Sequence, residues 1–336
     1  MRVSITDVAR QAGVTPAVVS RVLNADPKLQ IRAETRDRVL AAARELDYTP
    51  SHAARALRHS RAGALGLAVH DMANPLYGEI ILGAQKAAAD AGFVLLLADI
   101  DGLARGDDTF HRVVYGGAID GLLLQRAGTA SDRTIIGTAS ARIPTVLLND
   151  RSTTLASVAL DDLAGSRMAT QHLLDLGHTR IAHLKIGGTQ RSGNRVRGWR
   201  DALARAGLTP NPSWLVAGGH TVESGLAGMR SLLSRRPLPT AVVVGNVLAA
   251  IGALTAAREA GLDVPGRLSV VAFHDVLYAA HLTPALTAVA MPLRELGAAA
   301  VTLLMERLEG NEPRHVVVRD PAPVLVTRGS TAPPAS

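Results

Sequence analysis

A short run near the start of the chain carries side chains of the types that read DNA base edges. Arg21 presents a planar fork of donors that matches a guanine edge, whereas Pro16 and Ala17 offer only apolar contacts, for example to thymine methyl groups. We therefore predict that this run binds DNA. The predicted contacts are Ser4, Thr15, Pro16, Ala17, Ser20, Arg21 and Asn24.

Three short helices are expected to position these side chains. Ser4 to Asp7 has the pattern of a capping box, and apolar residues then recur at helical spacing up to Ala12. Gly13 can adopt a positive φ and end that helix, while Thr15 and Pro16 suit the cap and first turn of the next one. A third helix is predicted over about 32–46. Helix, glycine turn and helix form a helix-turn-helix unit; the alternative is a purely structural three-helix bundle.

Positive charge is concentrated in the same part of the chain. The whole protein has 336 residues and a net charge of +7. Residues 1–61 hold eleven Lys and Arg against six Asp and Glu, so five of the seven surplus charges lie there. A basic module on a nearly neutral body favours a polyanionic partner, although a solvated basic surface is the alternative.

The segment from Tyr48 to Arg58 is expected to order only when the protein is bound to DNA. It begins with a cap and a proline and continues in helix-forming residues, but it is too short to be a stable helix alone. Leu57 between Arg55 and Arg58 has the composition of a minor-groove wedge flanked by phosphate contacts; a plain linker is the alternative. The predicted contacts in this segment are Ser51, His52, Ala54, Arg55, Leu57 and Arg58.

Beyond residue 62, strand-like apolar runs alternate with helical ones. This alternation predicts parallel sheets that are covered on both faces. The number of strands is too large for one compact sheet, so we expect two Rossmann-like lobes with a ligand at the carboxyl ends of the strands. The predicted strands are Leu65–Val69, Phe93–Ala98, Leu122–Gln125, Thr145–Leu148, Ile181–Lys185, Ala241–Val244 and Leu268–Phe273.

The expected organisation is thus an all-α helix-turn-helix headpiece followed by an α/β body of two Rossmann-like lobes, and a resemblance to a known family implies that this body is periplasmic-binding-protein-like, binds an effector and dimerises. The headpiece covers 1–46, the hinge 47–61 and the effector-binding and dimerisation domain 62–330. Its first lobe is expected to comprise about 62–160 plus 290–320, and its second lobe about 161–289 plus 321–330. Residues 331–336 are expected to form a frayed tail.

Asp7 to Asn24, followed by Glu34 to Leu57, resembles the headpiece of the LacI/GalR family of transcriptional regulators. The turn, Arg21, Asn24 and Leu57 all fall at the family spacing. The resemblance implies a homodimer that reads a palindromic operator in double-stranded DNA, with the leucine at position 57 inserted into the central base step. Arg32-Ala33 departs from the Ser-Pro cap that the family often has, which costs about 1 kcal/mol of helix stability.

The body resembles the same family, and the resemblance implies a small-molecule effector bound between the lobes. Arg195, in the run Asn194 to Trp199, matches the arginine that binds effector oxygens, and it suits hydroxyl or carboxylate groups. Trp199 offers a stacking face, with a core position as an equal alternative. The predicted effector contacts are Asp71, Asn74, Leu76, Tyr77, Gln125, Asn149, Arg195, Trp199, Asn246, Phe273 and His274.

Three departures from the family pattern concern the effector. Asn149, Val247 and His274 stand where acidic residues are common. Carboxylates typically accept hydrogen bonds from paired sugar hydroxyls, so their loss beside a retained arginine permits an anionic effector, such as a sugar acid, a sugar phosphate or another carboxylate.

The sequence disfavours several other functions. The phosphate-loop, nucleophile-elbow and His-Glu-x-x-His patterns are absent, so an enzyme is not expected, and no catalytic residue, cofactor or metal site is predicted. The chain has no cysteine, which excludes disulfides and thiolate chemistry. His178 is expected to be structural. A periplasmic sugar-binding protein would share the body, but it would carry a signal peptide in place of the headpiece.

We therefore expect a cytoplasmic, nucleoid-associated regulator with no membrane segment. These patterns do not determine the operator sequence, the identity of the effector or the oligomeric state beyond a dimer. They also leave open the sign of the coupling between effector and operator and the choice between repression and activation.

Overall fold

The computed structural model describes residues 3–24, 26, 28–48, 62–100, 108–126, 130–187 and 190–335. The chain forms two compact units, which divide at Gly63 and Ala64. The predicted hinge contacts Ser51, His52, Ala54, Arg55, Leu57 and Arg58 lie outside the described residues.

The first unit contains three helices, α1 (Ile5–Ala12), α2 (Pro16–Leu23) and α3 (Ala33–Glu45). The carboxylate of Asp7 accepts hydrogen bonds from the amide and the hydroxyl of Ser4, at 3.0 and 2.6 Å, and so ties down the start of α1. Gly13 ends this helix with a φ of 66°, and the Thr15 hydroxyl accepts from the Val18 amide at the start of α2. Helix, turn and helix therefore form as the residue pattern predicts.

A small aliphatic core holds these helices together. Val8 and Ala12 of α1 pack with Val19 of α2 and with Val39 and Ala43 of α3, and all five are buried. With so small a core, the unit depends on the interlocking of its helices and on their caps.

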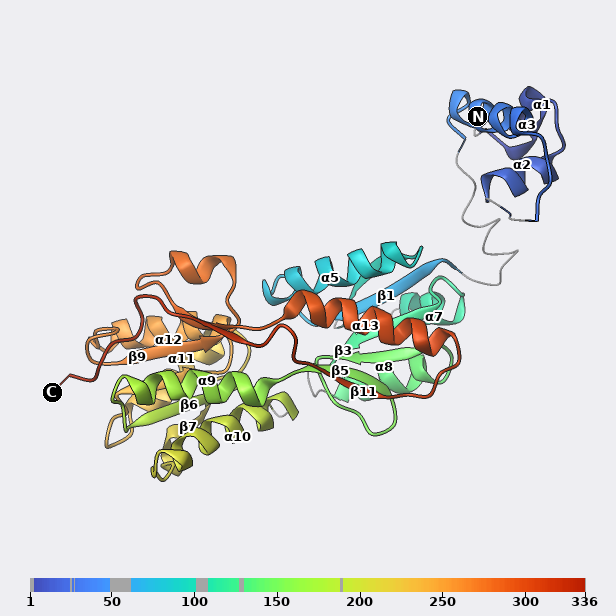
Figure 1. Cartoon of the computed structure of the whole chain (residues 1–336). Coiled ribbons are helices and arrows are strands. Elements are labelled where there is room, and N and C mark those ends of the chain that lie inside the picture. The colour runs from blue at the N-terminus through green and yellow to red at the C-terminus, as the bar shows by residue number, and fades with distance from the viewer. Residues whose placement is uncertain are drawn as a thin grey trace. The chain divides into compact units, whose positions relative to one another are not determined.

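The first lobe of the body is built on a parallel sheet in the order β11-β5-β4-β3-β1-β2. Helices α5 and α13 run side by side across one of its faces (Figure 1). The strands are β1 (Ala64–Val69), β2 (Val94–Asp99), β3 (Gly121–Gln125), β4 (Thr145–Leu148), β5 (Ala156–Leu160) and β11 (His315–Val318). The helices are α5 (Leu76–Asp90), α7 (Asp108–Tyr115), α8 (Ala130–Ser140) and α13 (Leu293–Leu308).

Two glycines set the close approach of α5 and α13. A Cβ on Gly83 would lie 2.0 Å from the carbonyl oxygen of Arg294, and one on Gly297 would lie 2.1 Å from that of Ile80. Such distances are shorter than any van der Waals contact, so each helix requires glycine where it crosses the other.

The second lobe repeats the architecture with the order β12-β10-β9-β8-β6-β7. All pairs are parallel except β10 with the edge strand β12. The strands are β6 (Ile181–Lys185), β7 (Leu215–Ala217), β8 (Ala241–Val244), β9 (Ser269–Phe273), β10 (Thr287–Ala290) and β12 (Val324–Val326). The helical segments are α9 (Asp162–Asp175), α10 (Gln190–Arg205), α11 (Val222–Leu233), α12 (Val247–Glu259) and the 3-10 turns η1 (Pro212–Trp214) and η2 (Leu277–His281).

Strand periodicity divides the apolar side chains of this lobe into two cores. In β8, Ala241 and Val243 join a core that continues into the first lobe, whereas Val242 and Val244 pack beneath α12. Successive side chains of a strand point to opposite faces, so a continuous apolar strand supplies both cores.

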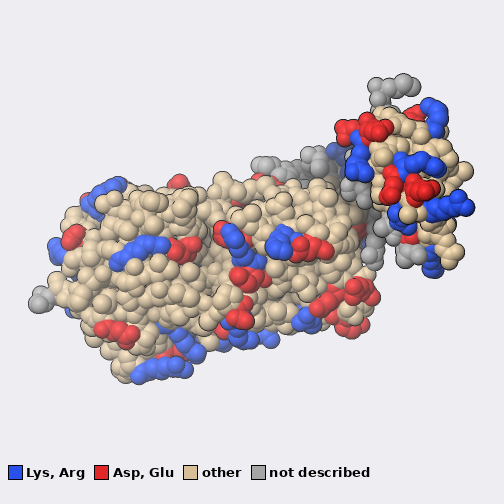
Figure 2. Space-filling view, turned by 45° about the horizontal axis from the view of Figure 1, so that its top comes forward, with Lys and Arg blue, Asp and Glu red and all other residues tan. Residues whose placement is uncertain are grey.

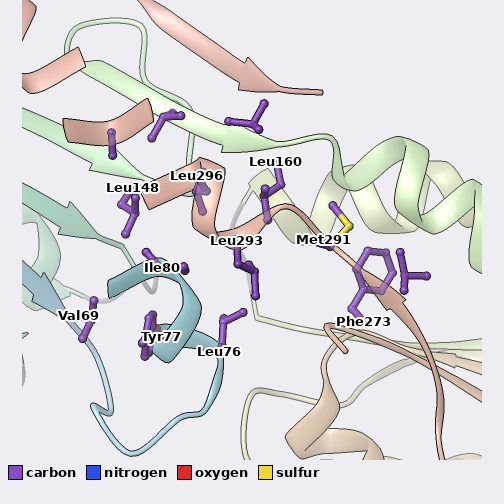
Figure 3. Close-up of a cluster of buried hydrophobic side chains, with 14 of the residues drawn as sticks. Val69, Leu76, Tyr77, Ile80, Leu148, Leu160, Phe273, Met291, Leu293 and Leu296 are labelled. Carbon is purple, nitrogen blue, oxygen red and sulfur yellow. The ribbon is translucent and has the colours of Figure 1, made fainter. Parts of the chain in front are cut away.

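The chain passes between the lobes three times: from β5 to α9, from β10 to α13 and from β11 to β12. Buried side chains fill the region around these passages (Figure 3), where Leu76 and Leu293 lie on the side of the first lobe and Met291 and Phe273 on that of the second. The two lobes therefore share one apolar cluster near their junction.

Two expectations need correction. The chain is not frayed from Thr331, because the Thr331 hydroxyl bonds to the ring of His172 and the Ala332 amide donates to Ser269. The predicted strands also did not include the edge strands β7, β11 and β12, which are three or four residues long, or the inner strands β5 and β10.

Candidate functional site

The predicted base-reading residues lie on the open side of α2 and its turn. Thr15, Pro16, Ala17 and Asn24 are exposed, while the opposite side of the helix buries Val19 and Val22. Lys and Arg lie next to Asp and Glu on the headpiece face that Figure 2 shows. An exposed N-terminal half of the second helix is the geometry with which such units enter a major groove.

Arg21 is held by the turn that follows its helix. Its Nε donates to the carboxylate of Asp26 at 2.8 Å, and the side chain is 38% exposed. Asp26 is itself anchored, because it accepts from the Lys28 amide at 2.9 Å. The side-chain amide of Asn24 donates to the carbonyl of Ser20 at 2.7 Å. The Arg21 side chain is thus oriented before any partner binds, which lowers the entropic cost of a base contact.

In the body, eight of the eleven predicted effector residues line one cavity of about 130 Å³. They come from the loop after β1, from the start of α5 and from the carboxyl ends of β3 and β8, together with α10 and the residue after β9. The eight are Asp71, Asn74, Leu76, Tyr77, Gln125, Arg195, Asn246 and His274. We call this cavity the effector pocket.

The other three predicted residues do not line the pocket. Trp199 is 1% exposed, donates from its indole to the Ile181 carbonyl at 3.2 Å and stacks on His183. It is a core residue, so the stacking role is corrected. Phe273 is fully buried with its ring 4.1 Å below the guanidinium of Arg195, so it supports that arginine. Asn149 is buried in a turn with a φ of 54° just after β4.

The predicted contacts did not include six residues that line the pocket: His70, Ile186, Arg191, His220, Thr221 and Val247. His70 and Ile186 directly follow strands, and Val247 follows the predicted Asn246, so their positions alone could have indicated them. Arg191 and His220 lie in segments that no local pattern ties to a strand end.

Polar pairs line much of the pocket. The Tyr77 hydroxyl donates to Gln125, and His70 bonds to Asp132 at 2.8 Å. The Asn246 side chain caps α12 by accepting from the Ala249 amide, and it donates to the carbonyl of Gly219. These bonds fix the wall, and they engage groups that a sugar would otherwise contact.

The guanidinium of Arg195 is hydrogen-bonded to other residues of the protein. It is 1% exposed, its Nε donates to Asp162 at 2.7 Å and it also donates to the Gly245 carbonyl. Its Nη2 donates to Nε2 of His274 at 3.0 Å. The positive charge is balanced by Asp162, which is equally buried. Burial still lowers the pKa of Arg195 from its usual value, with Asp162 opposing the shift.

His274 is neutral in this arrangement. Burial, followed by the charges of Arg195 and Arg191, holds its pKa well below the usual value of 6.5. A guanidinium can only donate, so Nε2 of His274 accepts and the ring proton lies on Nδ1. That Nδ1 is buried and has no hydrogen-bond partner among the described residues.

Arg191 is the second arginine of the pocket, and it forms no ion pair with a described residue. It is 5% exposed, and its Nε has no hydrogen-bond partner in the described part of the chain. Its Nη2 donates weakly to the Arg126 carbonyl at 3.4 Å. The charges of Arg191 and Arg195 add to burial in lowering the pKa of His220 to about 4. The pocket lining thus holds two arginines, Arg191 and Arg195, and the exposed carboxylate of Asp71, beside the neutral imidazoles of His220 and His274.

Other features of the body are more easily assigned. The rings of His178 bond to Thr240, Ser269 and the Ala332 carbonyl, which fits a structural role. Within the described residues, no group of three or more His, Cys, Asp or Glu side chains is placed to hold a metal ion. In the same residues no helix is long and apolar enough to cross a membrane.

Comparison with known proteins finds a family match in each of the two units. Residues 4–51 match the model for bacterial regulatory proteins of the lacI family, and residues 170–331 match the periplasmic binding protein-like domain. The ribose operon repressor of Escherichia coli K12 is 33% identical, covering 97% of this chain and 99% of that protein. The HTH-type transcriptional repressor PurR of Photobacterium profundum is 31% identical, covering 96% of this chain and 97% of that protein.

Solved structures give the same result. The lac repressor dimer bound to operator and the anti-inducer ONPF has a TM-score of 0.78 at 25% identity, covering 99% of this chain and all of that one. A LacI family transcriptional regulator from Mycobacterium smegmatis has a TM-score of 0.74 at 36% identity, covering 81% of this chain and all of that one.

A helix-turn-helix headpiece on a two-lobed, periplasmic-binding-protein-like body defines a bacterial transcriptional regulator with an effector-binding domain. The chain belongs to the LacI family. Members of this family bind operator DNA and small-molecule effectors and are not enzymes, so no residue of the pocket is assigned a catalytic role.

Proposed function

We propose that this protein represses transcription as a cytoplasmic homodimer on a palindromic operator, and that an anionic small molecule in the effector pocket controls its operator affinity. The effector belongs to the class of sugar acids, sugar phosphates or related carboxylates. Effector and operator are coupled because each favours a particular arrangement of the two lobes.

The buried charge of Arg191 carries the proposal. A guanidinium removed from water is costly unless an anion pairs with it, and Arg191 forms no ion pair with a described residue. The Nδ1–H of His274 adds a second buried donor without a partner. These two buried donors without a partner, one of them on the cationic Arg191, suit a carboxylate or phosphate better than a neutral hydroxyl.

The relatives leave the effector open. The ribose operon repressor and the CelR–cellobiose complex are named for neutral sugars. In this chain His274 and Val247 replace acidic groups that the family commonly uses to accept from sugar hydroxyls, and His274 now donates. We therefore propose that a pocket of the same architecture binds an anionic ligand that accepts hydrogen bonds, instead of a neutral sugar that donates them.

Calorimetry with three matched ligands tests this proposal. Glucose, gluconate and glucose 6-phosphate share a carbon skeleton and differ in charge. We expect an acidic member to bind, and Arg191→Gln to weaken it at least tenfold because one charge-assisted pair contributes about 1.5–3 kcal/mol. Arg200→Gln, an exposed site on the same helix, is the control. Tight binding of glucose with none of the acids would refute an anionic effector.

Selection of random-sequence duplex DNA, followed by sequencing at fixed salt, tests operator recognition. An enriched palindrome is expected. Arg21→Ala should then cost about 1–3 kcal/mol and relax the preference at one base of each half-site. Arg10→Ala, exposed on α1, should leave the sequence preference unchanged. If Arg21→Ala selects the same palindrome with the same base weights, Arg21 is not a base reader.

The domain boundaries are part of the same proposal. A headpiece over 1–46, a hinge over 47–61 and an effector domain over 62–330 imply that removal of residues 1–61 abolishes DNA binding. The remaining chain should stay a folded dimer, as measured by circular dichroism and sedimentation. An unfolded product would contradict the division into modules.

A further inference from the structure

A second cavity, of about 210 Å³, lies where the chain passes between the lobes. We call it the crossover crevice. Four arginines from three separate segments line it: Arg151 after β4, Arg191 and Arg197 on α10, and Arg319 after β11. Asn194 and His315 complete its polar wall.

The carboxylates in the crevice are already paired. Each of the three aspartates that line it has its own arginine: Asp150 bonds to Arg126 at 2.6 Å, Asp161 to Arg319 at 3.2 Å and Asp162 to Arg195 at 2.7 Å. Among the described residues this leaves the guanidiniums of Arg151, Arg191 and Arg197 without an ionic partner. The crevice therefore has a surplus of about three positive charges.

One of these cations is far from solvent. Arg151 and Arg197 are exposed, but Arg191 is only 5% exposed and its Nε is unpartnered in the described residues. The pKa of His315 is lowered by burial and by the charge of Arg151, which places a neutral ring beside the arginines. Several planar donor forks that surround one cavity suit an oxyanion that accepts hydrogen bonds on three or four oxygens.

We propose that the crossover crevice binds a phosphate-type oxyanion, either free phosphate or the phosphate group of a metabolite. The site is separate from the effector pocket, because Arg151 and Arg197 line only the crevice. Its walls come from segments on both sides of the interlobe passages, so an anion there bridges the two lobes. Because Arg191 lines both cavities, occupancy of one is thermodynamically linked to occupancy of the other.

Titration of inorganic phosphate into the full-length protein tests the site, with chloride adjusted to constant ionic strength so that screening does not change. Saturable binding is expected, and Arg151→Gln or Arg197→Gln should each weaken it about tenfold. Both side chains are exposed, so neither change threatens folding. Arg200→Gln, on α10 but away from the crevice, should bind phosphate as the unmodified protein does.

A variant of the effector pocket separates the two sites. His220→Gln alters only the effector pocket, so it should leave phosphate affinity unchanged even if the proposed effector is wrong. A loss with His220→Gln but not with Arg151→Gln would place the anion in the effector pocket and overturn the inference. Equal, unsaturable binding in every variant would also overturn it. Competition between glycerol 3-phosphate and inorganic phosphate shows whether the site prefers a phosphomonoester or the free ion, because the preferred ligand binds more tightly.

Discussion

The buried pair of Arg195 and Asp162 makes the stability of the second lobe sensitive to a single carboxylate. Both side chains are 1% exposed, and Nε lies 2.7 Å from Oδ1. At an effective dielectric constant of about 20, the Coulomb attraction at this distance is roughly 6 kcal/mol. Much of that is offset by the desolvation of the two groups, so the net value of the pair is small.

Asp162→Ala removes the attraction and leaves the desolvation of Arg195 in place. Loss of one partner of a buried pair typically costs about 3–5 kcal/mol. Arg195 keeps the Gly245 carbonyl, the ring of His274 and the face of Phe273, so we expect about 3 kcal/mol, at the low end of that range.

Urea unfolding monitored by tryptophan fluorescence measures this cost, with extrapolation to water. The chain's two tryptophans, Trp199 and Trp214, are both buried in the second lobe. Asp90→Ala is the control, because Asp90 pairs with Lys86 on the surface and such i,i+4 pairs contribute only about 0.3–0.5 kcal/mol. A loss below about 1 kcal/mol for Asp162→Ala would refute the view of Arg195 as a charge that depends on Asp162.

Two further predictions concern packing and pH. Gly83→Ala should destabilise the first lobe by about 1–3 kcal/mol or more, since the new Cβ would meet the Arg294 backbone at 2.0 Å. Gly78→Ala on the same helix meets nothing and should stabilise by up to about 1 kcal/mol; thermal unfolding of both variants checks this, and equal effects would refute the close contact. His183 is fully buried with its pKa lowered to about 3. Its unfolded form binds a proton below about pH 6.5, so the stability it contributes is complete above that pH and is lost as the pH falls toward 3. Urea unfolding of His183→Phe across pH 4–7 should show a flatter decline than the parent protein, and an identical decline would contradict the prediction.

Local chemistry explains why the headpiece helices and several inner strands were predictable. Ser4, Gly13 and Thr15 act through bonds to residues within four positions, so short patterns contain the whole cause. The apolar runs of β1, β4, β6 and β8 are buried on both faces and need no partner to be recognised. The edge strand β12 forms only because β10 lies beside it, and no short pattern contains that information.

The sequence predicted which strand ends line the candidate pocket, but it did not predict which charged side chains there are available to a ligand. His274 reaches the pocket through a turn with a φ of 71°, directly after Phe273 at the end of β9. Phe273 therefore faces the core, whereas His274 lines the pocket. The sequence alone does not tell which of these two side chains lines the pocket. Arg195 was expected to be free for a ligand, but Asp162, 33 positions earlier, already occupies it. Arg191 emerges as the available cation only when these distant partners are in place.

The three passages between the lobes have a consequence for synthesis on the ribosome. The first lobe lacks α13 and the strand β11 until residue 318 has been made, although β5 is complete at residue 160. At translation rates of about 5–20 residues per second, that interval lasts roughly 8–30 s. Throughout it the face of α5 that contains Ile80 and Gly83 has no covering helix. The nascent chain therefore presents an apolar surface to chaperones for almost half of its synthesis, while the small headpiece, complete by residue 45, can already be folded.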